Sequence, residues 1–186
     1  HSPTVPNEEH PFTISSPGNT DELRFSIKGL GDYTKLLPNL LVGDTALVEG
    51  PFGEFSYLYG KEKQVWVAGG IGITPFVSMA EHMLTLDTLP YTIDLFYSVR
   101  TEAEGAYKEL FTALQTKHPS FTFHYMPSDT QGYITGELLL HEIEDLLLRD
   151  IFVCGPPPLM AALNGQLREI NVPKKSIRME RFALLK

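Results

Sequence analysis

The sequence of 186 residues contains a single cysteine, Cys154. An internal disulfide and a cysteine-rich metal site are therefore excluded. No apolar run is long enough to span a membrane, and no signal peptide is recognisable. Lysine and arginine number 15 against 23 aspartates and glutamates, and the basic residues are scattered. Nucleic acid is thus not an expected partner, because binding to a phosphate backbone needs clustered basic residues.

The most informative segment runs from Val65 to Pro75 and reads VWVAGGIGITP. Its apolar start predicts a buried parallel strand, its glycines a tight turn open to a ligand, and Thr74 with Pro75 a capped helix start. Free amides and the positive end of the helix dipole would face the turn, so Gly70, Gly72, Thr74 and Pro75 are candidates for binding a pyrophosphate. The spacing is not that of the Rossmann fingerprint, and such turns also occur with nothing bound.

Strand and helix patterns alternate after a short polar stretch near residue 60. This alternation predicts a five-stranded parallel sheet flanked by helices, an α/β nucleotide-binding domain covering residues 61–186. Ligands of such sheets bind at the carboxyl ends of the strands. We expect strands at 64–68, 92–99, 121–126, 150–154 and 176–182, and helices at 75–86, 107–117, 136–148 and 159–170.

Residues 1–60 show a different pattern, with short alternating segments separated by turns. We expect strands at 10–15, 23–28 and 45–49, and one helix at about 33–40. Such a segment is typical of a partial antiparallel β-barrel, which would precede the nucleotide-binding domain.

Four further motifs stand out: HPFTISS from His10, KGLGDYT from Lys28, EGPFG from Glu49 and FVCGPPP from Phe152. Together with the glycine turn and an aromatic after an acidic residue near the C-terminus, they resemble the dehydrogenase module of the ferredoxin–NADP reductase superfamily. Within it, the ferric reductase and NADPH oxidase branch, of prokaryotic type, is most similar. That branch carries His-Pro-Phe-Thr/Ser where plant-type reductases carry Arg-x-Tyr-Ser/Thr. The six motifs occur in order over nearly the whole chain.

The resemblance implies that residues 1–60 form part of an FAD-binding domain. Phe12 would lie against the isoalloxazine ring, and Thr13 would hydrogen-bond near the flavin nitrogen that accepts hydride. His10 would lie toward the phosphate side, and Lys28 with the turn before residue 34 would hold the FAD pyrophosphate. The expected FAD contacts are His10, Pro11, Phe12, Thr13, Ser15, Lys28, Gly31, Tyr33 and Thr34.

The resemblance also implies NADPH binding by residues 61–186, with the pyrophosphate at the glycine turn and the nicotinamide bordered by Cys154, Gly155 and Pro156. Phe182 would cover the flavin face that the nicotinamide approaches, and Glu180 would line the same place. The residues expected to act in catalysis are Thr13, Cys154, Glu180 and Phe182. Two simpler interpretations stay open, because Cys154 also suits a small buried filler and Phe182 a core aromatic.

The choice between NADPH and NADH depends on the end of the second expected strand. An acidic residue there suits the ribose hydroxyls of NAD, whereas a basic residue accepts a 2′-phosphate. The chain has Ser98-Val99-Arg100 at this place, which favours NADPH. Glu102 and Glu104 follow closely and favour the opposite choice, and Arg100 also suits a solvated loop.

The function expected from the resemblance is hydride transfer from NADPH to FAD, followed by release of single electrons to a heme or metal acceptor. Only nine residues precede His10, so about half of the flavin domain, and the heme-bearing membrane helices of this branch, are expected outside the chain. The parent protein would then lie at the cytoplasmic face of the cell membrane, with this chain soluble and without a metal site. The alternatives are a soluble flavin reductase serving an iron–sulfur or oxygenase partner, and a non-catalytic NADPH-sensing module.

Overall fold

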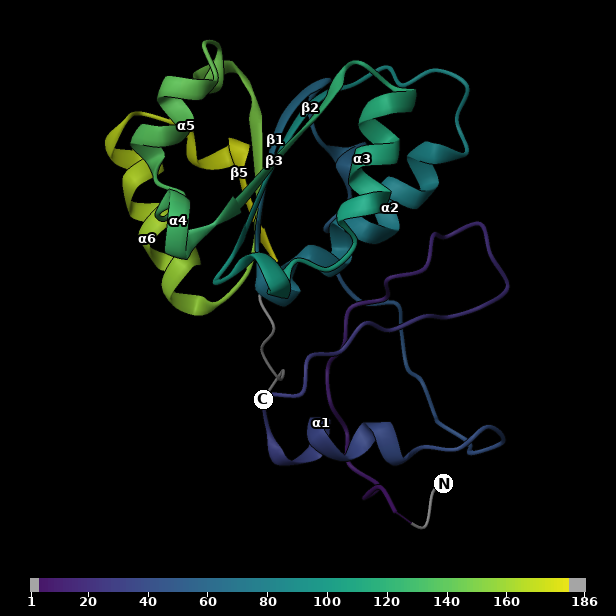
Figure 1. Cartoon of the computed structure of the whole chain (residues 1–186). Coiled ribbons are helices and arrows are strands. Elements are labelled where there is room, and N and C mark those ends of the chain that lie inside the picture. The colour runs from purple at the N-terminus through teal and green to yellow at the C-terminus, as the bar shows by residue number, and fades with distance from the viewer. Residues whose placement is uncertain (1–3, 181–186) are drawn as a thin grey trace.

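The computed structural model describes residues 4–180, and a five-stranded parallel sheet lies at its centre (Figure 1). The strand order is β3-β2-β1-β4-β5, so the direction of winding changes between β1 and β4. This confirms the expected α/β fold. The strands are β1 Lys63–Gly69, β2 Thr92–Val99, β3 Phe121–Pro127, β4 Asp150–Cys154 and β5 Ile177–Glu180.

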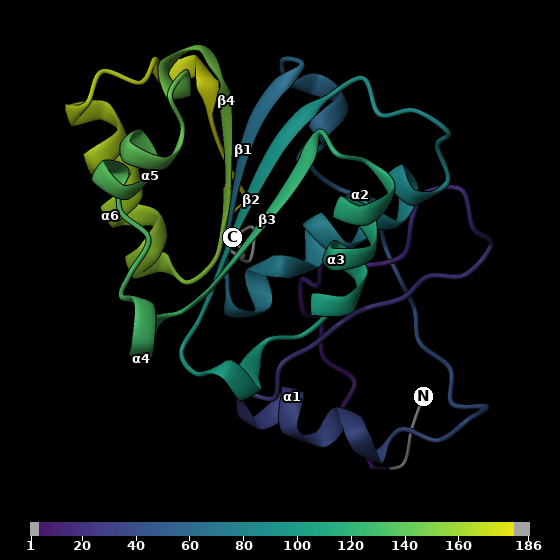
Figure 2. The same cartoon turned by 45° about the horizontal axis from the view of Figure 1, so that its top comes forward.

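Helices cover both faces of the sheet, as Figures 1 and 2 show. One face packs against α2 (Thr74–Leu84) and α3 (Lys108–Lys117), and the other against α5 (Gly136–Glu142) and α6 (Pro157–Glu169). A short helix, α4 (Ser128–Gln131), follows β3. The two faces therefore carry two separate hydrophobic cores.

The central strand β1 explains why the sheet is buried on both sides. Val65 and Val67 pack into one core, while Trp66 and Ala68 pack into the other, and all four are 0% exposed. This is the burial that a continuous apolar run produces in a parallel sheet covered by two helical layers. The buried amide of Gln64 is satisfied, since it donates to the carbonyls of Tyr57 and Lys61 and accepts from the Trp66 indole.

One helix expectation was wrong, because the helix predicted at 136–148 ends at Glu142. The backbone of Ile143 is extended, and a separate 3₁₀ turn follows at Leu146–Leu148. The break buries both Ile143 and Leu146 and places the Asp145 carboxylate against Arg149 and Lys63. Tertiary packing thus outweighs the helical propensity of this segment.

The strands expected before residue 60 are not formed. A single antiparallel bridge joins Ile14 to Phe25, and α1 (Asp32–Leu36), followed by a 3₁₀ turn at Leu37–Asn39, is the only expected element that appears in this segment as described. A strand needs a neighbour to complete its hydrogen bonds, and within residues 4–62 only this bridge supplies one. The strand predictions at 10–15, 23–28 and 45–49 were therefore wrong for this structure, and the barrel assignment stays a proposal.

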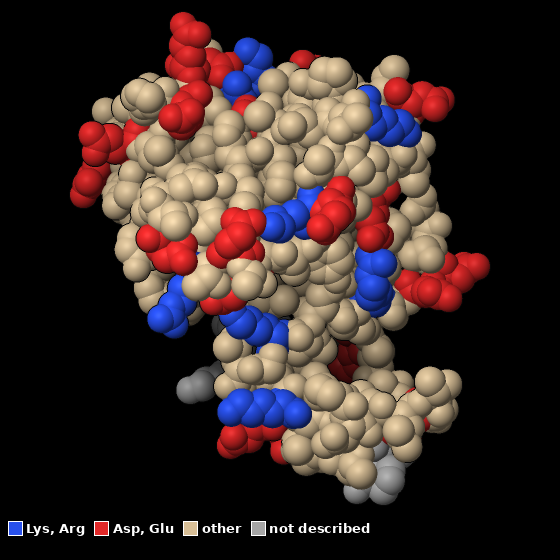
Figure 3. Space-filling model, viewed as in Figure 1, with Lys and Arg blue, Asp and Glu red and all other residues tan. Residues whose placement is uncertain are grey.

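The surface is mixed in charge and carries no sign of a basic groove on the face that Figure 3 shows, where basic side chains of the described residues are interspersed with acidic ones. Within residues 4–180, no helix has the length and apolar character needed to cross a bilayer.

Candidate nucleotide-binding site

The turn after β1 stands at the carboxyl edge of the sheet, where its backbone is partly open. Gly70 has a φ of +52°, a conformation that favours glycine, and no atom lies within 4 Å of where its Cβ would be. A 3₁₀ turn at Gly70–Ile73 follows and leads directly into α2. The first amides of such a turn have no acceptor within the helix, so they are available to a ligand above Gly70.

Gly69 and Gly72 serve a different purpose from Gly70. A Cβ on Gly72 would lie 2.2 Å from the carbonyl oxygen of Cys154, and one on Gly69 would lie 2.5 Å from a methyl carbon of Leu159. These two glycines let the turn after β1 pack against the turn after β4. Open space for a ligand is found at Gly70 alone among the three.

Thr74 and Pro75 do not occupy the expected cap positions. The helix begins at Thr74, so Pro75 is its second residue and Ile73 precedes it. The Thr74 hydroxyl donates to the carbonyl of Ile71 at 2.9 Å instead of accepting from an amide of the first turn. Both residues are buried. They shape the turn, and the part left for direct contact with a ligand is the backbone before them.

Ser98 and Arg100 lie beside this turn at the end of β2. The strand register pairs Ser98 with Gly69. Arg100 is exposed, its carbonyl accepts from the Asp129 amide, and its guanidinium makes no ion pair within the described residues. An exposed arginine two residues beyond Ser98, on the strand that neighbours the glycine turn, is an arrangement that suits a phosphate.

Glu102 and Glu104 form ion pairs with lysines and not with Arg100. Glu102 pairs with Lys108, and Glu104 pairs with Lys28 at 3.0 Å. The two carboxylates that favoured NADH in the sequence are therefore each neutralised by a lysine. Arg100 keeps its positive charge available at this edge of the sheet.

Cys154 and Glu180 are neighbours at the ends of β4 and β5, where the strand register pairs them. Burial, followed by the negative charge of Glu180, raises the pKa of Cys154 to about 12. The thiol is thus protonated at neutral pH and is not a nucleophile. Burial also raises the pKa of Glu180. Cys154 and Gly155 are both buried, whereas Pro156 is exposed.

The EGPFG motif lies close to Glu180, at the end of β5. The nearest atom to a Cβ on Gly53 would be a carboxylate oxygen of Glu180, at 4.0 Å. The structure therefore brings the turn after β4, the end of β5 and the EGPFG motif together, although they are far apart in the sequence. Phe182 lies outside the described residues.

The structure brings only some of the residues expected to bind FAD close to one another. The His10 ring stacks on Tyr33 with centroids 3.9 Å apart, and Phe12 lies 6.2 Å from His10. His10 also contacts the Glu8 carboxylate at 3.0 Å. Phe12 and Thr13 are half-buried, and Pro11 is exposed.

Three other FAD candidates already have partners. The buried Ser15 hydroxyl donates to the Arg24 carbonyl, and the Thr34 hydroxyl accepts from the amide of Gly31. The Lys28 ammonium pairs with Glu104, as described above. Ser15 and Thr34 thus hold the chain itself, and Lys28 would have to leave Glu104 to reach a pyrophosphate.

A set of contacts that the sequence did not indicate ties the N-terminal segment to the helical layer. Arg24 pairs with Glu81 of α2 at 2.6 Å, and the Ser78 hydroxyl donates to the Ser16 carbonyl at 2.8 Å. The Ser26 hydroxyl lies 2.5 Å from the Tyr107 hydroxyl. These partners are 57 to 81 positions apart in no periodic pattern, so no local signal could have found them.

Comparison with known proteins gives the family. Residues 66–164 match the profile described as the oxidoreductase NAD-binding domain. The chain belongs to this family. It lies within the ferredoxin–NADP reductase superfamily, as the six motifs indicated.

Curated relatives cover most of this chain but are longer than it. NADH-cytochrome b5 reductase 2 of Mycosarcoma maydis is 30% identical over 84% of this chain and 49% of its own length. A component of the Na(+)-translocating NADH-quinone reductase of Pseudomonas aeruginosa (strain UCBPP-PA14) is 29% identical over 82% of this chain and 40% of its own length. The chain spans about half the length, or less, of these relatives.

Solved structures share the fold. Ferredoxin-NADP+ reductase from Plasmodium falciparum, an H286K mutant in complex with 2′P-AMP, superimposes with a TM-score of 0.72 at 18% identity, over 91% of this chain and 76% of that one. The flavohemoglobin from Malassezia yamatoensis, with bound FAD and heme, gives 0.75 at 18% identity, over 95% and 47%.

Proposed function

We propose that this chain is the pyridine-nucleotide half of a flavin-dependent oxidoreductase, which takes hydride from NADPH, passes it to FAD and releases single electrons to an acceptor. The observation that carries the proposal is the open backbone at Gly70, together with the exposed Arg100 just after the neighbouring strand, whose guanidinium makes no ion pair within the described residues. The oxidoreductase names of the relatives agree with it.

The nucleotide fits the residues at the carboxyl edge of the sheet. The free amides above Gly70 would hold the pyrophosphate, and Ser98 with Arg100 would hold the 2′-phosphate of the adenosine half. The edge formed by Cys154 and Glu180 would face the nicotinamide. A protonated, buried thiol there excludes water and leaves a small apolar wall, which suits orientation better than proton transfer.

The redox chemistry would come from the bound NADPH and FAD, while this chain binds, orients and shields them. Residues 1–60 would supply part of the FAD domain, through Phe12, Thr13 and the His10–Tyr33 stack, and residues 61–186 the NADP domain. Lys28 would exchange Glu104 for the FAD pyrophosphate. Because residues 4–62, as described, have one bridge and no complete sheet, we expect this chain alone to bind FAD weakly. A tight one-to-one complex, seen as quenched flavin fluorescence, would contradict this.

The choice of NADPH over NADH rests on Arg100 and is open to a direct test, since the relatives named above are described with NADH. We expect calorimetric titration of the chain to show tighter binding of NADPH. Arg100→Ala should weaken NADPH about tenfold, the order expected for a lost hydrogen bond to a charged group, and leave NADH nearly unchanged. Arg168→Ala, which removes an exposed arginine from the last turn of α6, is the matched control. Equal losses for both nucleotides would show that Arg100 does not bind the 2′-phosphate.

The ferric reductase and NADPH oxidase subtype is the finer proposal, and the motif from His10 to Thr13 supports it. The parent protein would then carry a heme-bearing membrane domain upstream and work at the cytoplasmic face of the membrane. In a protein extended through the rest of the flavin domain, NADPH should bleach the flavin absorbance, and a ferric chelate or oxygen should restore it. Restoration only by an iron–sulfur protein would favour a soluble flavin reductase, and no bleaching would favour a nucleotide sensor.

A further inference from the structure

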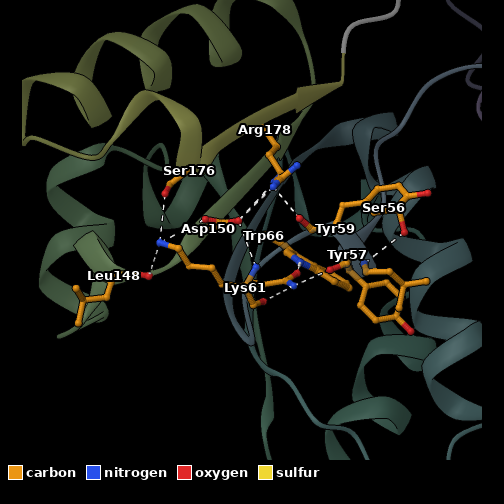
Figure 4. A network of polar contacts seen from close by, with 11 residues as sticks. Ser56, Tyr57, Tyr59, Lys61, Trp66, Leu148, Asp150, Ser176 and Arg178 are labelled. Atoms are coloured by element: carbon orange, nitrogen blue, oxygen red, sulfur yellow. Dashed lines mark hydrogen bonds and ion pairs between the residues drawn. The ribbon is translucent and has the colours of Figure 1, made fainter.

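A second polar site lies at the amino ends of the strands, opposite the candidate nucleotide site. Figure 4 shows Lys61, Asp150, Ser176 and Arg178 of this site. A cavity of about 410 Å³ opens where β1, β4 and β5 begin. Two of its walls come from segments far apart in the sequence, since one precedes β1 and the other includes the start of β5. It is lined by Tyr59, Gly60, Lys61, Asp150, Lys175, Ser176 and Arg178.

The charge of this cavity is opposite in sign to that of the chain as a whole. Lys61, Lys175 and Arg178 face one carboxylate, Asp150, whereas the chain has a net charge of −8. Asp150 is buried and is reached by Lys61 at 3.6 Å and by Arg178 at 3.5 Å. These are long contacts that leave the guanidinium outside a bidentate pair.

The donors divide into two groups. Lys61 is saturated, since its ammonium donates to the Leu148 carbonyl at 2.8 Å and the Ser176 hydroxyl at 3.3 Å. Arg178 donates through Nη2 to the Tyr59 carbonyl at 2.7 Å and through Nε and Nη2 to one oxygen of Asp150 at 3.5 Å, whereas its Nη1 has no acceptor within the described residues. The Lys175 ammonium likewise has no acceptor there. An anion in the cavity could therefore accept from Nη1 of Arg178, from the Lys175 ammonium and from the Ser176 hydroxyl.

We propose that this cavity binds a small oxyanion of the phosphate class. A guanidinium and an ammonium converging on one cavity, with two positive charges in excess of the single carboxylate, match a doubly charged phosphate. The anion would join the segment before β1 to the start of β5. Since β5 is an edge strand of four residues that pairs only with β4 within the described chain, its attachment would become tighter. Glu180 at its other end borders the candidate nucleotide site, so the anion would steady that edge too.

The test uses inorganic phosphate and the whole chain without nucleotide, followed by amide NMR. We expect phosphate to shift the amides of residues 59–61 and 175–178 and to slow hydrogen exchange in β5. Lys175→Gln should weaken this binding about tenfold, which corresponds to about 1.4 kcal/mol, and the double variant with Arg178→Gln should abolish it. Lys35→Gln, which removes an exposed lysine from the last turn of α1 that has no acceptor within the described residues, is the matched control and should bind phosphate as the unchanged chain does.

Three results would overturn the proposal. They are an undiminished response in Lys175→Gln, a response confined to the Gly69–Thr74 turn, and the same response to chloride at matched ionic strength. Because the Lys175 side chain makes no contact on which the fold depends, the single variant keeps the test decisive even where the double variant loses stability. Failure here leaves the nucleotide proposal intact, since the two sites occupy opposite edges of the sheet.

Discussion

Two regions of the molecule fold very differently: the first region, residues 4–62, and the second region, residues 63–180. Leu47 and Leu95 are leucines of these two regions, in that order. Leu95, in β2, is 0% exposed, whereas Leu47 is 93% exposed. The contrast is general, because almost every buried apolar side chain of the described residues lies in 63–180, and only Val5 and Tyr57 belong to residues 4–62. The exposed ones of the first region include Leu23, Leu30, Leu40, Leu41, Val42, Leu47, Val48, Phe52, Leu58 and Tyr59.

The two regions differ in whether their strands and apolar side chains find packing partners, and not in whether they contain apolar residues. Within residues 63–180 each strand finds a parallel neighbour and each face of the sheet finds two helices. In residues 4–62 the apolar side chains of Leu23, Phe25 and Ile27 alternate as in a strand, but a single bridge is the whole of the strand pairing described there. Burial of apolar surface stabilises a fold by about 25 cal/mol per Å², and only the second region obtains this stabilisation in full.

The largest expected effect tests this contrast directly. Leu95→Ala should lower the free energy of unfolding by about 2–5 kcal/mol, because it opens a cavity in the core between the sheet and the layer of α2 and α3. Leu47→Ala should change it by less than about 0.5 kcal/mol, because the side chain is already in water. Urea denaturation followed by circular dichroism measures both. A comparable loss in the two variants would mean that Leu47 is buried in solution and that the regions are alike.

The next largest effect on the free energy of unfolding is expected where the turn after β1 contacts the backbone after β4. Gly72→Ala places a Cβ against the Cys154 carbonyl, and neither backbone can yield easily, so we expect a loss of about 1–3 kcal/mol. Gly165→Ala, inside α6 and with no atom near its Cβ position, should instead stabilise the chain by about 0.5–1 kcal/mol. The same denaturation experiment checks both. A neutral Gly72→Ala would show that the two turns are not held in contact.

The sequence was sufficient for the nucleotide-binding domain because its signals are local. The strands expected at 64–68 and 92–99 were predicted nearly to the residue. The helix at 136–148 was not, because Ile143 breaks it in order to bury itself against the sheet. That choice depends on packing partners that no local pattern contains.

The geometry of the candidate site was predictable in part. The open turn at Gly70 and the exposed Arg100 were expected from residue type and position. The roles of Gly69 and Gly72, by contrast, come from contact with the turn after β4, which lies more than 80 positions further along the chain. The pairing of Lys28 with Glu104 likewise joins two segments that only the folded structure brings together.

The pH dependence of stability should arise from buried charge in the second region. Asp94 accepts from Arg149 at 2.7 Å and lies 3.0 Å from His124. Burial alone would raise the pKa of Asp94, but the hydrogen bonds and charges of His124 and Arg149 outweigh it, and the pKa lies below its ordinary value of 3.8. A depressed pKa means that this stabilisation is complete above 3.8 and is lost as the pH falls through the lower, folded value.

Asp94→Asn should therefore flatten the acid limb of a plot of unfolding free energy against pH, an effect smaller than those above because Arg149 keeps Asp145 as a partner. The matched control from the first region is Asp21→Asn, which removes an exposed carboxylate without an ion pair in the described residues and should keep the acid limb of the unchanged chain. Parallel curves for all three proteins would place the pH dependence elsewhere.

The smallest effect is expected where the two regions meet, at the ion pair of Lys28 and Glu104. Their side chains are 46% and 36% exposed, so solvent screens the pair. A double-mutant cycle with Lys28→Gln and Glu104→Gln should give a coupling below about 1 kcal/mol that declines with added salt. A pair this weak can separate at little cost, as Lys28 must if it is to hold an FAD pyrophosphate. A coupling of several kcal/mol would instead mean that residues 4–62 are held as firmly as the sheet, with Lys28 committed to Glu104.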